Sequence, residues 1–562
     1  MLLNPVADAI CTILAIMRIG AVYIPLDVRN SEERLVSIVT QSKAMLVIFH
    51  DSTQDQLSKI QTYLPHAIRS VNISIVANDS RTVPNRSTAD SPAFVMFTSG
   101  STGKPKGVML KHSNFLTHVL AASKEMDLRI GREVVLQQSA FGYDASLAQI
   151  FYALANGGSL VMTSNRGDME DIAALMLKEN ITFMLASPSE YLILYQYGKE
   201  FLKSCTSWRI AMCGGEAFSS NLKQLFHDLN IPDLKVWNAY GPSEISVASS
   251  FHCVPYDAIA LHDTTKVPIG RAITNYAVYI LDPESAQPLP VGWVGEICIG
   301  GPAVSAGYLN NETMTMDRFI PDTISSTSAS GWKSLYRTGD QGRMLSDGSI
   351  AYLGRIAGDS QIKLRGIRIE LDEISISILQ TSAGVVSNAA VCTWGEGQEQ
   401  FLVAFVVFAV NQVPENADEY LHGLISSLPL PSYMRPAMAV PIDKLPMNAS
   451  GKLDRRALRD LSLPEIVEQR DDDSLTDTEV KLKQIWTDVL ANSQVKLQIR
   501  KQSDFFSVGG NSLLLLKMHR QLKQNLYKDI PLSALFQNSD LQTLARRLDN
   551  DIGDLVTQSL ID

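Results

Sequence analysis

The chain has 562 residues, of which 45% are hydrophobic and 19% are charged, the balance of a soluble globular protein too long for one core. This length predicts roughly three to four folding units. With 49 basic and 59 acidic residues the net charge is −10, and no long basic run occurs, so neither nucleic acid nor an anionic membrane is an expected partner.

The N-terminal segment 9–26 is apolar, but Arg18 interrupts it, Asp8 precedes it and no cleavage-like site follows. We therefore predict a buried helix leading into a strand, and not a signal peptide or a membrane anchor. A polar helix at 31–41 and a buried strand at 44–49 continue an α/β rhythm.

An apolar strand at 94–97 then runs into a loop of hydroxyl residues, glycines and lysines. Such a loop suits phosphate, because hydroxyls donate hydrogen bonds, glycines let backbone N–H groups close around an anion, and lysines add charge. Gly100 and Gly103 are only two residues apart, and Pro105 would spoil a helix after Lys104, so this is not a Walker A loop. The alternative is a flexible surface loop.

The next part of the chain predicts a parallel sheet covered by helices. Strands are expected at 159–163, 183–186, 209–213 and 235–238, with helices between them at 169–179 and 221–229. Such sheets leave crevices for ligands at the carboxyl ends of their strands.

The block at 238–244 follows the last of these strands and combines an aromatic ring, a tight turn and a carboxylate. Tyr240 is a candidate to face an adenine, and Glu244 is a candidate Mg²⁺ ligand because magnesium prefers oxygen ligands. By itself the block is more typical of an ordinary Gly-Pro turn after a strand.

From about residue 267 short strands at 277–281, 295–299 and 348–353 predict a small β-subdomain. Asp340, on the turn at 336–340, suits bidentate hydrogen bonding to a ribose diol, with Arg355 as a partner near ribose and phosphate. Taken alone, both are also typical of surface turns.

A strand at 361–369, a helix at 371–381 and a strong strand at 401–409 predict a compact α+β unit that ends near residue 458. Its exposed loop at 448–455 carries Lys452 beside a glycine, and a solvated lysine is the default interpretation.

Residues 464–473 are polar, close with three aspartates and read as a linker. A capping box, Thr476 with Glu479, starts a helix to about residue 491, and helical patterns at 512–525 and 541–549 complete a bundle of about 75 residues. Ser512, just after a Gly-Gly turn, is by itself an N-cap candidate.

The strings at 94–107, 238–244, 336–340, 361–371, 448–455 and 504–514 together resemble the motifs of an adenylation–peptidyl carrier didomain of a nonribosomal peptide synthetase, in the adenylate-forming enzyme superfamily. The resemblance covers nearly the entire chain and is closest to fungal polyketide–nonribosomal peptide hybrid synthetases. It implies a large α/β N-terminal subdomain with a β-subdomain at 1–354, a small α+β C-terminal subdomain at 355–460, a linker at 461–474 and a helical-bundle carrier domain at 475–550.

The resemblance also implies roles for individual residues. Lys452, Glu244 and Thr98 would be catalytic, with Glu244 holding Mg²⁺, and Asp359 would be the hinge after a local expansion at 356–358. ATP and AMP would be bound by Thr98, Ser99, Gly100, Ser101, Thr102, Gly103, Lys104, Asn238, Ala239, Tyr240, Gly241, Asp340 and Arg355.

In this family the residue matching Asp144 pairs with the α-ammonium of the substrate, which argues for an α-amino acid, although an acid at a helix N-terminus is also favoured by the dipole. The implied pocket is apolar and mostly small, so we expect a bulky hydrophobic or aromatic side chain. Its residues are Asp144, Ala145, Ala148, Leu185, Met212, Gly214, Ala239, Val247 and Ala248, with Lys452.

The implied reaction is ATP-dependent formation of an aminoacyl-adenylate, followed by transfer to 4′-phosphopantetheine on Ser512. A phosphopantetheinyl transferase and condensation or polyketide synthase modules, in cis or in trans, are the expected partners. An acyl- or aryl-CoA ligase is disfavoured by Asp144 and the carrier domain. A truncated, non-catalytic carrier or scaffold module is the other alternative, supported only by an N-terminus shorter than the family's.

The six cysteines are scattered, with no CxxC pair and no histidine at metal-binding spacing, which argues against a zinc site and a disulfide framework. They are Cys11, Cys205, Cys213, Cys253, Cys298 and Cys392. A reducing, cytoplasmic location is expected.

Overall fold

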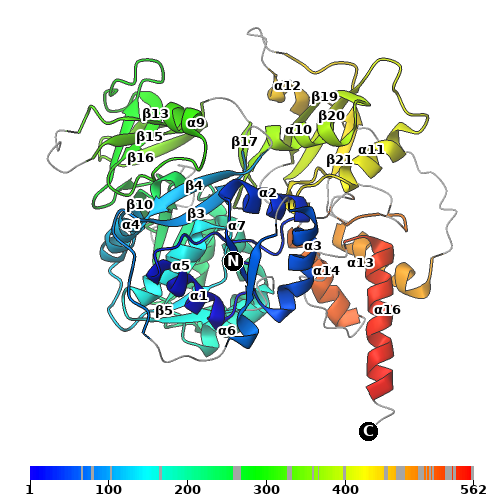
Figure 1. Ribbon diagram of the computed structural model, residues 1–562, viewed down its shortest axis with the longest axis horizontal. Helices are drawn as coiled ribbons and strands as arrows, with labels where there is room; N and C mark the ends of the chain where they lie inside the picture. Colours follow the sequence, from blue (N-terminus) through cyan, green and yellow to red (C-terminus); the bar gives the residue numbers. More distant parts are fainter. Residues whose placement is uncertain are drawn as a thin grey trace. The chain divides into compact units, whose positions relative to one another are not determined.

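The chain forms two compact units, Met1–Gly100 with Lys104–Arg368, and Ile369–Asp562. Figure 1 traces both in a computed structural model. The residues that it describes are 1–64, 67–76, 82–100, 104–163, 168–256, 267–325, 332–356, 360–364, 366–395, 400–447, 453–461, 463, 475–490, 499–501, 503–505, 508, 510, 512–525, 535 and 539–558.

The first unit begins with three helices and a pair of parallel strands. The helices are α1 (Ala7–Arg18), α2 (Glu32–Ser42) and α3 (Gln54–Tyr63), and the strands are β1 (Leu46–Phe49) and β2 (Arg69–Asn72). Ser31 caps α2 by accepting a hydrogen bond from the backbone of Arg34. The helix predicted at 31–41 and the strand predicted at 44–49 are confirmed as α2 and β1. The strand expected at the end of segment 9–26 is instead a single bridge between Tyr23 and Phe94.

An antiparallel hairpin of β3 (Pro92–Thr98) and β4 (Lys106–Lys111) frames the predicted phosphate loop. The helix α4 (His112–Glu125) follows β4 directly. Phe94 of β3 packs edge-on against Phe115 of α4, with ring centroids 5.1 Å apart, and Phe115 packs against Phe151, 5.4 Å away. Each such pair contributes roughly 1 kcal/mol beyond its buried area, so the hairpin is anchored to the helices behind it.

A seven-stranded sheet forms the centre of this unit, as Figure 1 shows. Its strand order is β11-β10-β9-β8-β7-β5-β6, and the five strands from β5 to β9 are parallel. The strands are β5 (Val134–Gln137), β6 (Ser159–Met162), β7 (Phe183–Ala186), β8 (Ile210–Gly214), β9 (Lys235–Tyr240), β10 (Ser250–Cys253) and β11 (Arg271–Ala272).

Helices cover this sheet. The helix α5 (Asp144–Leu154) packs on β5, β6 and β7, while α7 (Pro188–Ser204) packs between α6 (Met169–Lys178) and α8 (Ser220–Leu229). The predicted α/β organisation is therefore confirmed, and the carboxyl ends of the parallel strands form one edge.

The predicted β-subdomain is a five-stranded sheet with the order β12-β13-β15-β14, in which β16 also pairs with β15, on the edge opposite β13. Its elements are β12 (Ala277–Leu281), β13 (Val294–Gly300), α9 (Glu312–Arg318), β14 (Phe319–Pro321), β15 (Ser334–Met344) and β16 (Ile350–Arg355). The single strand predicted at 361–369 is wrong. It is two strands, β17 (Gln361–Leu364) and β18 (Ile367–Glu370), because Gly366 has a φ of +77° and turns the chain.

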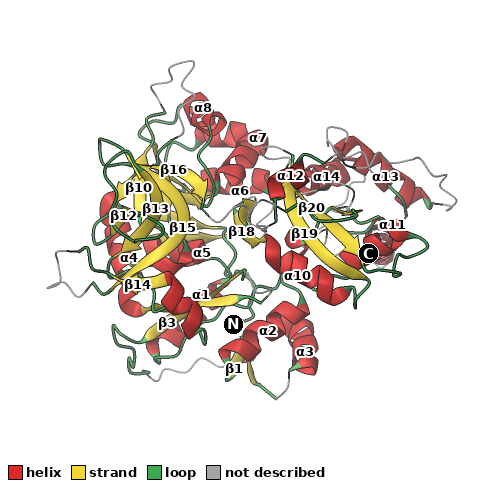
Figure 2. Cartoon of the chain, turned by 90° about the horizontal axis from the view of Figure 1, so that it is seen from above, coloured by secondary structure: helices red, strands yellow, loops and turns green. Residues whose placement is uncertain are grey.

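The second unit contains an α+β part, and Figure 2 shows strands of its sheet in yellow. The sheet order is β19-β20-β21, from β19 (Val386–Trp394), β20 (Phe401–Phe408) and β21 (Met438–Pro441). The helices α10 (Leu371–Thr381) and α12 (Arg455–Arg459) pack on β19, and α11 (Ala417–Ser426) packs on β21.

The described residues that follow form three helices, α13 (Asp477–Leu490), α14 (Ser512–Asn525) and α16 (Leu541–Gln558), with α13 packed on both others. The predicted capping box is confirmed, because the side chains of Thr476 and Glu479 each accept a hydrogen bond from the other residue's backbone. Trp486 and Phe505 pack edge-on in their core. Across the described residues, no helix has both the length and the apolar character needed to cross a membrane.

Candidate active site

The described part of the phosphate loop places its hydroxyls at the end of β3. Thr98 pairs with Lys106 across the hairpin, and its buried hydroxyl has no hydrogen-bond partner among the described residues. The hydroxyl of Ser99 donates to the backbone carbonyl of Arg368 at 3.0 Å. A Cβ at Gly100 would lie 2.1 Å from the carbonyl oxygen of Lys104, so only glycine fits there.

Glu244 lies at the centre of a buried ionic cluster. Its carboxylate is fully buried, 3.1 Å from the guanidinium of Arg368 and 3.4 Å from the ammonium of Lys106, and it accepts a hydrogen bond of 2.8 Å from Tyr308. Burial alone raises the pKa of Glu244, but Arg368 and Lys106 outweigh it and hold that pKa well below its ordinary value. The carboxylate is therefore ionised and paired with two cationic side chains.

Tyr240, Asp340 and Arg355 form a second cluster. The hydroxyl of Tyr240 donates to the Asp340 carboxylate at 2.5 Å, and Arg355 donates to the other carboxylate oxygen at 2.8 Å. Arg355 also donates to the carbonyl of Thr338. The turn predicted at 336–340 is wrong, because these residues lie within β15, where Asp340 pairs with Arg355 of β16. Burial, followed by the Asp340 charge, raises the pKa of Tyr240 well above its ordinary value, so the phenol stays a donor.

The remaining predicted residues of the strand-end block lie beside these clusters. Asn238 is buried and donates to the carbonyl of Pro268 at 2.8 Å. Ala239 is buried at the end of β9, and a Cβ on Gly241 would come within 2.5 Å of Ala248, so a glycine is needed at this close approach.

Two residues that sequence reasoning did not single out belong to the same region. Arg368 pairs with Glu244, and the ammonium of Lys363 lies 5.8 Å from the centroid of the Tyr240 ring, within cation–π range. Both lie in the segment that resembles the family's post-hinge motif. The sequence around a basic residue in a strand does not indicate which residue, more than 100 positions away, it will contact.

The predicted substrate residues come together at the carboxyl edge of the central sheet. Leu185 pairs with Met212 on the neighbouring strand, and Gly214 pairs with Ala239 on the next. One apolar cluster contains the large and small members of the set: Ala145, Ala148, Leu185, Met212, Ala239, Val247 and Ala248. The structure thus gives these side chains a common, apolar environment.

Asp144 is the charged member of this set. It is the first residue of α5, where the helix dipole favours an acid, and it accepts hydrogen bonds from the Ser243 side chain and the Ala145 backbone. Burial is the main cause that raises the pKa of its carboxyl, with the charge of Glu244 adding to it. A carboxylate in such an environment is stabilised by a bound cation.

Several predicted residues lie outside the described part of the chain: Lys452, Ser101, Thr102, Gly103 and the hinge residue Asp359. Lys104 is described and exposed. Ser512 is the first residue of α14, and its side chain is also outside the description.

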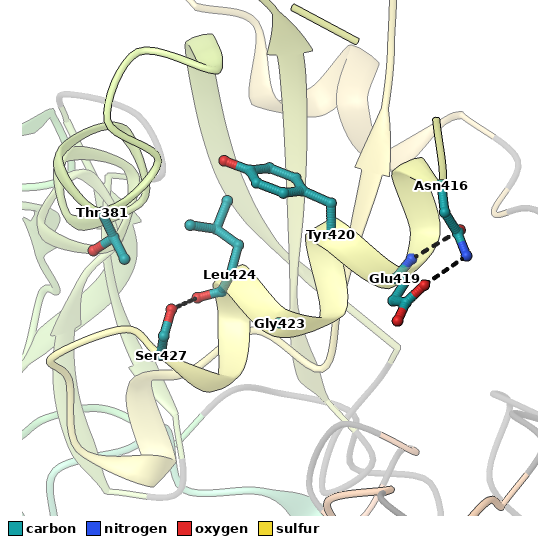
Figure 3. A pocket seen from close by; sticks show the side chains of 7 residues that line it. All are labelled: Thr381, Asn416, Glu419, Tyr420, Gly423, Leu424 and Ser427. Carbon is teal, nitrogen blue, oxygen red and sulfur yellow. Dashed lines mark hydrogen bonds between the residues drawn. The ribbon is translucent and has the colours of Figure 1, made fainter. Parts of the chain in front are cut away.

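A separate hollow of about 470 Å³ lies in the second unit, and Figure 3 shows its lining on α10 and α11. Thr381, Asn416, Glu419 and Tyr420 are among the lining residues, and none of the predicted site residues belongs to them. No cationic side chain lines it, so this hollow does not suit a nucleotide phosphate.

The chemistry of the first unit's clusters fits a nucleotide with a divalent metal. The orphaned hydroxyl of Thr98 lies on the same hairpin as Lys106, which meets the Glu244 carboxylate. A hydroxyl donor, a cation and an acidic oxygen are what a metal–triphosphate needs from its protein. The Asp340 carboxylate supplies an acceptor of the kind that a ribose diol requires.

Two family models match the chain. The model described as AMP-binding enzyme matches residues 1–309, and the model described as phosphopantetheine attachment site matches residues 480–548.

Curated relatives are fungal synthetases. The polyketide synthase–nonribosomal peptide synthetase hybrid himA of Aspergillus japonicus is 46% identical over 97% of this chain, and the hybrid psoA of Aspergillus fumigatus is 44% identical over 98%. The nonribosomal peptide synthetase acrB of Aspergillus aculeatus is 40% identical over 97% of this chain. The chain spans 14% of the length of each hybrid and 35% of acrB.

Solved structures share the fold. Holo-PA1221, an NRPS protein with adenylation and PCP domains, has a TM-score of 0.73 and 24% identity, covering 98% of this chain and 88% of that one. The Vibrio cholerae adenylation domain AlmE has a TM-score of 0.66 and 23% identity, covering 82% and 87%. The chain therefore belongs to the AMP-binding enzyme family of adenylate-forming ligases, with the adenylation–carrier didomain fold and a phosphopantetheine attachment domain, and its relatives are fungal polyketide–nonribosomal peptide hybrid synthetases.

Proposed function

We propose that this chain activates an α-amino acid with ATP as an aminoacyl-adenylate and transfers the aminoacyl group to a phosphopantetheine thiol on Ser512. The observation that carries the amino-acid part is Asp144, a single acid among apolar pocket residues at the strand edge. An α-ammonium group satisfies this carboxylate, whereas a fatty or aryl acid would leave it without a cation.

In the first step an oxygen of the amino acid's carboxylate attacks the α-phosphorus of ATP. The bond to the bridging oxygen breaks, and pyrophosphate leaves with the electron pair. Thr98 and the glycines of its loop would hold the phosphates, Glu244 would hold Mg²⁺, and Lys452 would offset the negative charge that builds up during the attack. Mg²⁺, when bound, would supply further positive charge beside the phosphates.

The nucleoside end of ATP is held by the second cluster. Asp340 accepts from the ribose hydroxyls, Tyr240 offers its ring to the adenine, and Arg355 keeps the Asp340 carboxylate in place. These contacts orient the α-phosphorus toward the carboxylate held through Asp144, and orientation of this kind contributes several kcal/mol to catalysis.

In the second step the aminoacyl carbonyl carbon would lose its bond to the phosphate oxygen of AMP and gain one to the carrier's thiol sulfur, with AMP leaving with the electron pair and the thiol proton released to solvent. Phosphopantetheine supplies that thiol when it is attached to Ser512 by a phosphopantetheinyl transferase. Condensation or polyketide synthase modules, in cis or in trans, would then use the loaded amino acid, a proposal supported by the hybrid relatives. The apolar and mostly small pocket residues favour a bulky hydrophobic or aromatic amino acid.

Amino-acid-dependent exchange of labelled pyrophosphate into ATP tests the first step. Purified protein is assayed with each of the twenty amino acids, beside Lys452→Ala and Asp144→Ala. The matched control is Lys444→Ala, an exposed lysine on the same unit. We expect exchange with one or a few hydrophobic amino acids, retained by the control and lost in both test variants.

Ser512→Ala separates the two steps, because it should keep pyrophosphate exchange and lose covalent loading of the labelled amino acid. Folded protein that exchanges with none of the twenty amino acids would refute activation of a proteinogenic amino acid. Release of an acyl-CoA when free coenzyme A is added, with no loading of Ser512, would instead identify a CoA ligase.

A further inference from the structure

A buried histidine joins two helices and the residue that precedes β12. The Nε2 atom of His118, on α4, is 2.7 Å from the hydroxyl of Tyr152 on α5, and its Nδ1 atom is 3.0 Å from the hydroxyl of Tyr276. His118 and Tyr152 are fully buried, and Tyr276 is 6% exposed. We call these three residues the histidine bridge.

The hydrogen bonds of the bridge have one direction that satisfies every group. Tyr276 donates to the backbone carbonyl of Ile245 at 3.0 Å, so its oxygen is left to accept from Nδ1–H of His118. The Nε2 atom then accepts from the hydroxyl of Tyr152. This requires a neutral imidazole, and burial does lower the pKa of His118, to about 3.

One end of the bridge holds a strained loop. Ser246 and Val247 have φ angles of +63° and +76°, which are costly for residues other than glycine and most of all for a β-branched one. Tyr276 bonds the carbonyl of Ile245, next to these residues, and the backbone of Ala248 hydrogen-bonds with His118. The histidine bridge therefore contacts the loop on both sides of the strained residues Ser246 and Val247.

The other end of the bridge binds α5, the helix whose first residue, Asp144, accepts a hydrogen bond from Ser243 at the start of the same loop. Asp144, Ala148 and Tyr152 follow one another at intervals of four residues along α5 and so lie on one stripe of the helix. Two members of the stripe are predicted substrate contacts, and the third is the residue that His118 binds.

We propose that the histidine bridge is a positioning device that fixes the strained wall at Val247 relative to Asp144 and so sets how tightly the amino acid is bound. The proposal rests on the proposed function for its substrate. It adds residues that touch neither amino acid nor nucleotide. Glu244 lies at the start of the same loop but has its own anchors in Arg368, Lys106 and Tyr308, so ATP binding should depend far less on the bridge.

Tyr276→Phe and Tyr152→Phe test the proposal, because each removes one hydroxyl and keeps the ring in the core. Tyr256→Phe is the matched control: that buried hydroxyl also donates to a backbone carbonyl, of Leu234 at 2.6 Å, but belongs to no part of the pocket. Hydrogen–deuterium exchange of the segment 243–249 is compared first, without any substrate. Pyrophosphate-exchange kinetics then give separate KM values for amino acid and ATP.

We expect Tyr276→Phe to speed deuterium uptake in segment 243–249 by about tenfold, with no change there in Tyr256→Phe. Both bridge variants should raise the KM for the amino acid by about threefold to tenfold and leave the KM for ATP unchanged. Unaltered uptake in Tyr276→Phe, the same uptake change in the control, or equal rises in both KM values would overturn the proposal. A wild-type protein that exchanges with no amino acid refutes the proposed function instead, and the uptake comparison still decides whether the bridge positions the loop.

Discussion

His118 makes the stability of the first unit depend on pH in a calculable way. The unfolded chain takes up a proton on this imidazole below its ordinary pKa of 6.5, whereas burial lowers the folded-state pKa to about 3. The unfolded state therefore binds more protons between these values, so the free energy of unfolding falls as pH drops from 6.5 toward 3. At pH 4.5, two pH units below the unfolded value, the loss is about 2.7 kcal/mol.

Urea unfolding followed by tryptophan fluorescence measures this loss against His118→Gln, which cannot titrate. Other titrating groups act alike in both proteins, so the stability advantage of the wild type over the variant should shrink by about 2.7 kcal/mol between pH 7.5 and pH 4.5. His227→Gln, at an exposed position on α8, should track the wild type at both pH values. A wild-type advantage that changes by less than about 1 kcal/mol would mean that His118 is protonated in the folded state.

Three further results are expected. Glu244→Gln leaves the guanidinium of Arg368 without its buried counter-charge and should destabilise the first unit by about 3–5 kcal/mol in urea unfolding. A loss of less than about 1 kcal/mol would show instead that the ion pair is solvated. Asp340→Asn should raise the KM for ATP roughly tenfold or more in pyrophosphate exchange with the amino-acid KM unchanged, and equal rises would contradict a ribose role. Thr476→Ala removes the acceptor for the Glu479 backbone and should lower the stability of the carrier helices by about 1 kcal/mol in thermal unfolding, whereas no shift would mean that the cap frays.

Local patterns were enough to predict many elements of both units. The strand Phe183–Ala186 and the helix Leu371–Thr381 lie at the predicted positions, because an unbroken apolar run and an amphipathic repeat each leave one favourable conformation. The strand predicted at 361–369 failed at Gly366, where an apolar–polar alternation continues through a turn that only the positive φ reveals.

Residues of the candidate site were indicated where they sit in short motifs, and not where they depend on partners distant in sequence. The motifs indicated Glu244 and Asp340, but no local pattern indicates that Arg368 reaches Glu244 across 124 positions. His118 was missed for the same reason: a lone histidine in a helix carries no sign of the two tyrosine hydroxyls that meet it. Val247 gave no sign of its positive φ, because β-branched residues rarely adopt one.

The hydrogen bond from Ser99 to the carbonyl of Arg368 joins residues 269 positions apart. A ribosome adds roughly 5–20 residues per second, so the phosphate loop waits on the order of 15–50 s after its own synthesis for this partner to emerge. The central sheet can form during that interval, because its parallel strands end at Tyr240. The order of synthesis thus allows the scaffold to form before this anchor of the phosphate loop, so a nascent chain that stops short of Arg368 carries a loop without it.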